Sequence, residues 1–161
     1  MAELKRGEPF SVSPQTLVTA RRYDVAIKWR HFMGLLSIWP VWRSSPTYLW
    51  HIAKRHEGGT RDSNKVGLAD YLAHAEVLAY SMRHNGFDKR FAIPVDRKGE
   101  LMGGAHRLAC ALALKLEQVP ILCMHEDAWA PPWGLQWFID NGMPEADLER
   151  LKADFEEMQH A

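Results

Sequence analysis

Cysteine is scarce in this chain, and long apolar runs are missing. The 161 residues include two cysteines, Cys110 and Cys123, whose spacing is not that of a metal site. We interpret both as reduced core residues of a cytoplasmic protein and expect no structural zinc. The chain has no run of about 18 apolar residues, so no membrane span is expected. The first six residues lack the apolar core of a signal peptide. These absences predict a cytoplasmic protein without a membrane partner.

Net charge is also missing, because 20 Lys and Arg residues balance 20 Asp and Glu residues. A protein that binds DNA irrespective of sequence normally needs a basic face, so this balance disfavours DNA as a partner. The last helical pattern of the chain is acidic, and an acidic helix repels phosphate. A local basic groove remains compatible with the composition.

Composition divides the chain into three parts. We expect residues 1–20, with Pro9 and Pro14, to form a loosely held arm. Residues 21–125 are expected to form the main domain, and residues 126–161 a C-terminal helical extension. An apolar stripe in the last helix is typical of core packing or of an oligomer contact, which leaves a homodimer open. Its residues are Leu148, Leu151, Phe155 and Met158.

Hydrophobic periodicity and turn residues predict the elements of the main domain. A helix is expected at about 65–85 with Gly86 as its terminator, and a strand with Pro120 on a sheet edge at 119–124. Further strands are expected at 91–95 and 100–102, and further helices at 48–56, 105–116, 133–140 and after Pro144. This order predicts an α+β fold: a small mixed sheet with flanking helices, and extra helical segments at both ends.

The glycine turn at 103–107 is the most informative stretch of the sequence. Gly103 and Gly104 let the backbone approach a ligand, and His106 and Arg107 follow at the expected start of a helix. A helix start has unpaired N–H groups and a partial positive charge, so it attracts phosphate. Arg107 can hold two phosphate oxygens at once. The alternative is that His106 and Arg107 merely brace the helix.

The order of motifs around this turn resembles the ParB/sulfiredoxin superfamily. A helix ends in Ser81–Phe87, a strand carries Ile93-Pro94-Val95, and Gly103-Gly104-Ala105-His106-Arg107 precedes an Ala/Leu helix and Val119-Pro120-Ile121. ParB-type domains have a similar progression, sulfiredoxins carry Gly-Gly-Cys-His-Arg at the turn, and free-serine kinases of the same fold carry a related Gly-x-His-Arg. The resemblance covers about 60 residues of the main domain.

The resemblance implies a ParB/sulfiredoxin-like nucleotide-binding domain. Its phosphate site would be built from the turn, with two further residues from the preceding helix: Gly103, Gly104, Ala105, His106, Arg107, Ser81 and His74. Ala105 stands where sulfiredoxins carry their reactive cysteine. A sulfiredoxin-type reductase needs that thiolate, so this activity is not expected.

A phosphate site without a thiol favours an ATP- and Mg-dependent phosphotransferase. The expected acceptor is a small hydroxyl compound such as a sugar or an amino acid, and the choice between ATP and CTP stays open. Magnesium usually takes one or two carboxylates besides phosphate oxygens, so no dense acidic motif is required. The alternatives are a nucleotide-gated, ParB-like binding or regulatory protein without catalysis, and a non-enzymatic scaffold subunit.

Candidate catalytic and substrate-binding residues come from the N-terminal half. The candidate general bases are Asp24, Glu57 and Asp62, each of which also fits an ordinary surface carboxylate. Basic residues interleave with aromatic ones nearby, a pattern that fits stacking on a base or a sugar but also a solvated face. The candidate substrate-binding residues are Arg22, Lys28, Trp29 and Arg30.

Overall fold

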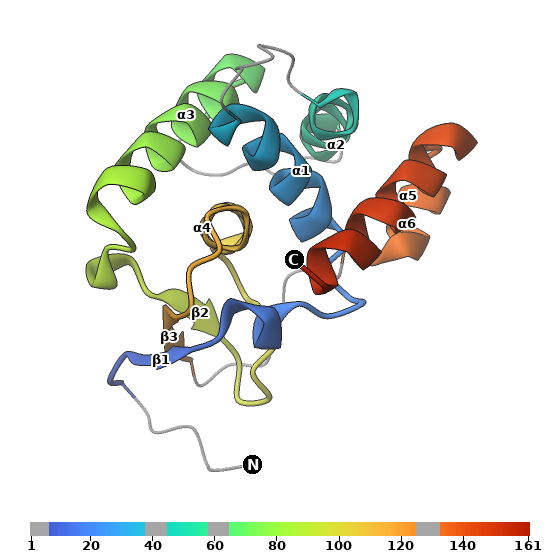
Figure 1. The fold of residues 1–161 in the computed structure, drawn as a ribbon. Coiled ribbons are helices and arrows are strands. Elements are labelled where there is room, and N and C mark those ends of the chain that lie inside the picture. Colours follow the sequence, from blue (N-terminus) through green and yellow to red (C-terminus); the bar gives the residue numbers. More distant parts are fainter. Residues whose placement is uncertain (1–6, 38–44, 58–64, 125–132) are drawn as a thin grey trace.

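The structure, a computed structural model, describes residues 7–37, 45–57, 65–124 and 133–161. Within these residues, six α-helices and a three-stranded sheet form the expected α+β fold. Helix α4 lies at the centre, with the sheet on one side and helices α1 and α3 on the other (Figure 1). No helix of the described residues is long and apolar enough to cross a membrane.

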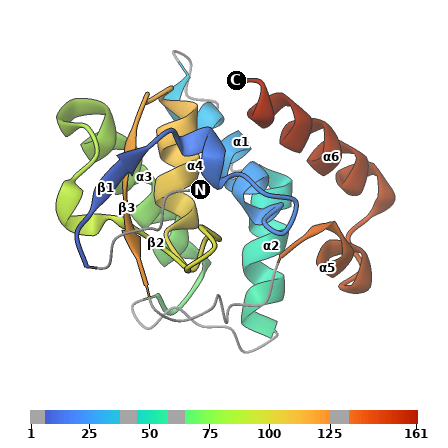
Figure 2. The same cartoon turned by 90° about the horizontal axis from the view of Figure 1, so that it is seen from below.

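The sheet is mixed and has the strand order β1-β3-β2. Strand β1 (Phe10–Val12) runs antiparallel to β3 (Val119–Cys123), and β2 (Ile93–Val95) runs parallel to it. The predicted strand at 100–102 is reduced to one bridge between Val95 and Leu101. Figure 2 shows the three strands side by side, with the parallel pair connected through α4.

Two predictions are wrong at this sheet, both because the pairing of β1 with β3 was not foreseen. The segment 1–20 was expected as a loose arm, but residues 10–12 pair with β3 and Leu17 is buried in the 3-10 helix η1 (Pro14–Leu17). Because β1 covers β3, Pro120 lies on the central strand and not on an edge. A proline lacks only its own N–H, so it costs that strand at most one ladder hydrogen bond.

Helix α4 (Ala105–Ala113) begins at the glycine turn and carries apolar residues that pack against α1, α3 and η1. Leu108 and Leu112 of this helix are buried. The helix ends before the predicted residue 116, because Lys115 adopts a positive φ of 53°. A left-handed residue is a common way to end a helix.

Helix α1 (Asp24–Leu36) is absent from the sequence predictions, although it has the most extensive contact with α4. It is buried on almost every side, including the polar residues Asp24, Lys28 and His31. Asp24 and Lys28 stand at buried positions of this helix, so an expectation that charged residues face solvent does not reveal it. The acidic Asp24 in its first turn favours the start of the helix through the helix dipole.

Helices α2 (Pro46–Glu57) and α3 (Leu68–Asn85) confirm the helices predicted there. Asp70 accepts hydrogen bonds from the backbone N–H groups of Val66 and Gly67 at the start of α3, at 2.8 and 3.3 Å. Gly86 ends the helix with φ 72° and donates its N–H to the carbonyl of Met82. A 3-10 helix, η2 (Lys89–Phe91), then leads into β2.

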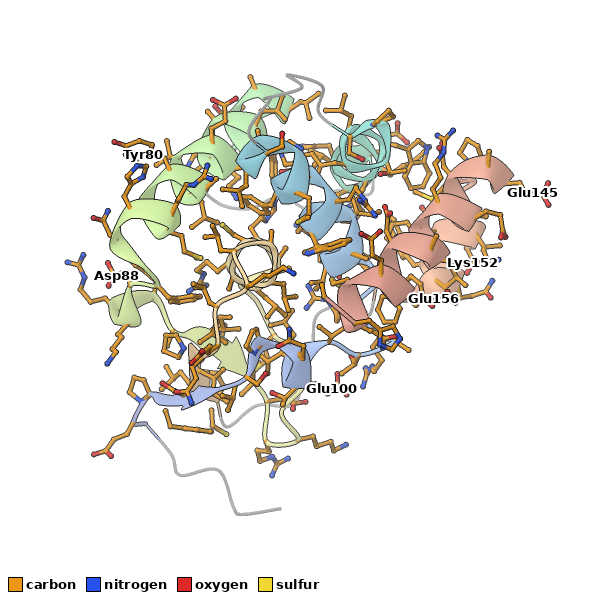
Figure 3. All side chains as sticks on the ribbon, viewed as in Figure 1. Tyr80, Asp88, Glu100, Glu145, Lys152 and Glu156 are labelled. Atoms are coloured by element: carbon orange, nitrogen blue, oxygen red, sulfur yellow. The ribbon has the colours of Figure 1, made fainter. Side chains whose placement is uncertain are left out.

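Helices α5 (Leu135–Asp140) and α6 (Glu145–Gln159) form the C-terminal part, as predicted. Tyr23 stacks on Phe155 of α6 with ring centroids 4.1 Å apart. The stripe on α6 is largely buried, so it serves as core packing against α1. Labelled residues of the opposite, charged side, Glu145, Lys152 and Glu156, point away from the body (Figure 3).

Candidate functional site

The first turn of α4 has backbone amides without partners among the described residues. Gly104 precedes the helix in the left-handed region, at φ 74°. The amide N–H groups of Ala105, His106 and Arg107 make no hydrogen bond to another described residue. Such a helix start is suited to an anion. A side chain at Gly104 would be strained, and its Cβ would lie 3.0 Å from the Arg107 guanidinium.

His106 and Arg107 leave this turn in different directions. The His106 Nε2 lies 2.9 Å from the Tyr48 hydroxyl, among α1, α2 and α3. We call this the interior side. Arg107 extends towards η2 and donates hydrogen bonds to the carbonyls of Phe91 and Ala92. We call this the open side. The two side chains therefore do not converge on one group, and only the amides between them are shared.

The open side contains a pocket of about 290 Å³ between α3, η2 and the start of α4. It brings His74 and Ser81 of α3 together with Arg107, three of the seven residues for which the resemblance predicts one site. The other four, Gly103, Gly104, Ala105 and His106, do not line this pocket. The remaining walls are largely apolar and comprise Val77, Leu78, Met82, Gly86, Phe87, Asp88 and Phe91. Small-molecule pockets are typically apolar with a few convergent polar groups, and this pocket has that character.

Two pocket residues, Asp88 and Phe91, were missed by sequence reasoning. The Asp88 carboxylate caps η2 by accepting from the Arg90 backbone N–H at 3.0 Å, and it pairs with the Arg90 side chain. Phe91 is 60% exposed at the pocket wall, which is unusual for a large apolar side chain. Both residues follow closely after Gly86, the predicted end of α3, and this position was the available signal that they lie near the end of that helix.

The interior side holds a buried ion cluster centred on Asp24. Its carboxylate accepts hydrogen bonds from Arg22 Nε at 2.8 Å and from Lys28 Nζ at 2.6 Å. Burial raises the pKa of Asp24, but Arg22 and Lys28 outweigh it and hold this pKa well below its usual range. Burial also lowers the pKa of Lys28 to about 8, although Asp24 opposes that shift.

This cluster also supports the glycine turn. Arg22 donates a second hydrogen bond, from Nη1 to the carbonyl of Leu101, at 2.8 Å. Leu101 comes two residues before Gly103, so the start of α1 is tied directly to the chain that enters α4. The ion cluster is therefore a structural brace for the site.

The three candidate bases are not brought together. Asp24 is enclosed by two cations, which makes it a poor proton acceptor. Glu57 is exposed at the end of α2 and pairs with Lys54 at 2.7 Å. Asp62 lies outside the described residues.

The four candidate substrate-binding residues do not gather at one site but form two pairs: Arg22 and Lys28 share Asp24, and the Arg30 guanidinium lies 4.9 Å from the Trp29 ring centroid. Arg22 and Lys28 are held by Asp24 on the interior side. Trp29 is 1% exposed in the core. Arg30 points to α6, where it pairs with Asp154 at 2.7 Å and with Glu157. The surface interpretation of this basic segment is thus wrong for Arg22 and Lys28, which are buried.

The surroundings of His106 were not anticipated from sequence. Its ring lies edge-on to Phe32 and Tyr48 and close to Tyr71. Burial lowers the pKa of His106 well below its usual range, and the nearby cations Lys28, Lys65 and Arg55 lower it further. His106 is therefore a neutral imidazole at pH 7. Tyr48 and Arg55 lie on α2, where only aromatic and basic spacing could have pointed to them.

In the part of the chain that the structure describes, no three His, Cys, Asp or Glu side chains gather to hold a metal ion. A magnesium ion at this site would therefore be held mainly by ligand phosphates and water, with Asp88 as the carboxylate that lines the pocket. Comparisons of the chain with family models, with curated proteins and with solved structures gave no match.

Proposed function

We propose that this protein binds a nucleoside triphosphate on the open side and transfers its terminal phosphoryl group to a small hydroxyl compound. The base occupies the pocket between α3 and η2, and the phosphates lie along the first turn of α4. The observation that carries the proposal is the gathering of His74, Ser81 and Arg107 around one pocket. His74 and Ser81 come from α3 and Arg107 from α4, and the ParB/sulfiredoxin resemblance implies that they bind one nucleotide.

The size and lining of the pocket support a base more than a whole nucleotide. Pockets for complete small-molecule ligands occupy roughly 300–1,000 Å³, and this one measures about 290 Å³. Phe87 and Phe91 offer aromatic surface for stacking. The phosphates then extend beyond Arg107 to the amides of Ala105 and His106, where a helix start favours negative charge.

Phosphoryl transfer depends mainly on positioning and on neutralising charge. Arg107 and the first-turn amides of α4 would hold the phosphates, and His106 would add a neutral donor on the interior side. Magnesium, held with the help of Asp88, would supply further charge neutralisation. Ala105 leaves the turn without a nucleophilic thiol, so direct transfer to the acceptor hydroxyl is the chemistry that fits this chain.

Calorimetry with ATP and magnesium tests the binding step. Arg107→Ala should weaken binding about tenfold or more, since charge-assisted contacts are worth about 1.5–3 kcal/mol. The matched control is Arg83→Ala, which removes an exposed arginine of α3 that does not line the pocket. Unchanged ATP affinity in the Arg107 variant would remove the basis of the proposal.

The transfer step needs a separate assay, in which ADP is measured while sugars and amino acids are offered as acceptors. A kinase makes ADP faster with the right acceptor. One observation favours the second candidate, a nucleotide-gated binding protein: the described carboxylates Asp24 and Glu57 are both engaged in ion pairs. Tight ATP binding with no acceptor-dependent ADP would support that candidate.

A further inference from the structure

His106 forms its hydrogen bond through a different ring nitrogen from two other helical histidines, His74 and His84. On α3, His74 and His84 each use Nδ1 to bond the carbonyl four residues earlier, Asp70 at 2.7 Å and Tyr80 at 2.8 Å. His106 instead uses Nε2, which lies 2.9 Å from the Tyr48 hydroxyl. The difference follows from position, because His106 is the second residue of α4 and the carbonyl four residues earlier belongs to the turn and not to the helix.

We propose that Tyr48 is a positioning residue that keeps the single proton of His106 on Nδ1, so that Nδ1–H donates to the ligand phosphates. The tautomer is argued from the Tyr48 contact and from the neutral His106 ring, without any ligand. Its role towards phosphate rests on the proposed function.

The direction of the Tyr48–His106 hydrogen bond follows from acidity. A phenol O–H is a better donor than an imidazole N–H, and an imidazole nitrogen is a better acceptor than a phenol oxygen. Tyr48 therefore donates to Nε2, and the proton of the neutral ring must sit on Nδ1. The cations near His106 act in the same sense, since they disfavour a second proton on the ring.

The hydroxyl of Tyr48 is held firmly enough to enforce this choice. Its ring is 0% exposed and stacks on His31 with centroids 4.1 Å apart and planes 4° from parallel. The His106 ring is in turn restricted by edge contacts with Phe32 and Tyr48.

The Nδ1 atom of His106 is also in the right place to meet a ligand. It makes no hydrogen bond to another described residue, and His106 as a whole is half-buried. Nδ1 lies nearer the backbone than Nε2, and helical side chains lean towards the helix start. Its proton is therefore close to the free amides of Ala105 and His106, where the proposed phosphates bind.

Nitrogen-15 NMR of the histidine-labelled protein tests the tautomer without any ligand. His106→Ala identifies the signals of His106. We expect Nδ1 to resonate as a protonated, pyrrole-type nitrogen and Nε2 as an unprotonated one. In Tyr48→Phe the two tautomers should mix. The matched control Tyr80→Phe removes an exposed hydroxyl on α3 next to His84, so it should leave the His106 signals unchanged.

Two spectra would overturn the inference: protonated Nε2 or a doubly protonated ring in the wild type, or an unchanged His106 tautomer in folded Tyr48→Phe. If that variant does not fold, the wild-type spectrum alone decides.

Titration with ATP and magnesium separates this inference from the proposed function. Tyr48→Phe should bind ATP about three- to tenfold more weakly, as expected for a misdirected hydrogen-bond donor, while Tyr80→Phe binds normally. Equal affinity of both variants would overturn the role of Tyr48 in ligand binding. Absence of ATP binding in the wild type, together with protonated Nδ1, would contradict the proposed function and still support the tautomer.

Discussion

The two sides of the α4 start differ in burial and in charge pairing. On the interior side, Asp24 and Lys28 are almost fully buried and bonded to each other, and His106 meets a buried tyrosine. On the open side, His74, Ser81 and Phe91 are exposed around a largely apolar pocket. Buried charges are costly unless they are paired, so few substitutions of the interior residues should be tolerated. The residues of the open side can instead be chosen for the ligand that they bind.

This difference teaches where stability and binding are separable. Residues of the interior side fix the backbone of the glycine turn, as the Arg22 hydrogen bond to Leu101 illustrates. On the open side, Ser81 and Phe91 are exposed, whereas Arg107 ties α4 to the carbonyls of Phe91 and Ala92. Changes on the interior side should therefore lower the free energy of unfolding, and changes at Ser81 or Phe91 should alter ligand affinity alone.

The largest effect is expected from Asp24→Asn. Removing this charge leaves Arg22 and Lys28 buried without their shared partner, and breaking a buried pair costs about 3–5 kcal/mol. Urea unfolding followed by circular dichroism measures the loss. The control, Glu57→Gln, breaks the exposed pair with Lys54 and should cost less than about 1 kcal/mol. Equal losses in the two variants would remove the distinction between the sides.

A pH-dependent loss of stability is the next largest effect. Burial lowers the pKa of His31 to about 4, below its ordinary value of 6.5. Between these values the unfolded chain binds the proton and the folded one does not, so stability falls as the pH drops through this window. A shift of this size corresponds to about 3 kcal/mol.

His31→Phe tests this contribution. Phenylalanine keeps the stack on Tyr48, and neither ring nitrogen of His31 has a partner to lose. The free energy of unfolding, measured from pH 7 to pH 4, should fall less steeply in the variant than in the wild type. His51 and His106, whose pKa values are lowered mainly by burial, account for the remaining slope. Identical slopes would contradict a neutral, buried His31.

A smaller effect, confined to binding, is expected from Phe91→Ala on the open side. Stacking of a base on an aromatic ring is worth about 1–3 kcal/mol, so ATP affinity should fall about tenfold. The midpoint of thermal unfolding should not change, because Phe91 is 60% exposed. A large fall in stability would show that the pocket wall is part of the core.

The smallest effect is expected from Ser81→Ala. Its hydroxyl is exposed in the pocket, and loss of one neutral hydrogen bond should weaken ATP binding about threefold. Calorimetry beside the Phe91 variant ranks the two contributions. A greater loss for Ser81→Ala than for Phe91→Ala would argue that the pocket recognises its ligand through polar groups.

The sequence was sufficient for the elements with strong local patterns. Helix α3 has a clear apolar face and ends at Gly86, and α4 starts directly at Gly104, so both are predicted within a few residues. The turn at 103–107 stands out because glycine, histidine and arginine in this order are informative without tertiary contacts.

The rest depended on contacts between distant residues. Helix α1 is recognised only once Asp24, Arg22 and Lys28 are seen to neutralise one another in the interior. Likewise, nothing in residues 10–12 indicates a strand until Phe10 is placed beside Ile121. His106 and Arg107 are adjacent in the sequence but point in different directions, because successive side chains leave a helix on different faces.

The short strand β1 protects the sheet from other chains. Its three residues cover one edge of β3, whose Val119 and Ile121 are apolar and buried. An uncovered apolar strand is a template on which another chain can pair, which leads to aggregation. Release of Phe10–Val12 would expose that edge while the parallel pair with β2 stayed intact. Strand β1 therefore shields an apolar edge of β3 as well as completing the sheet.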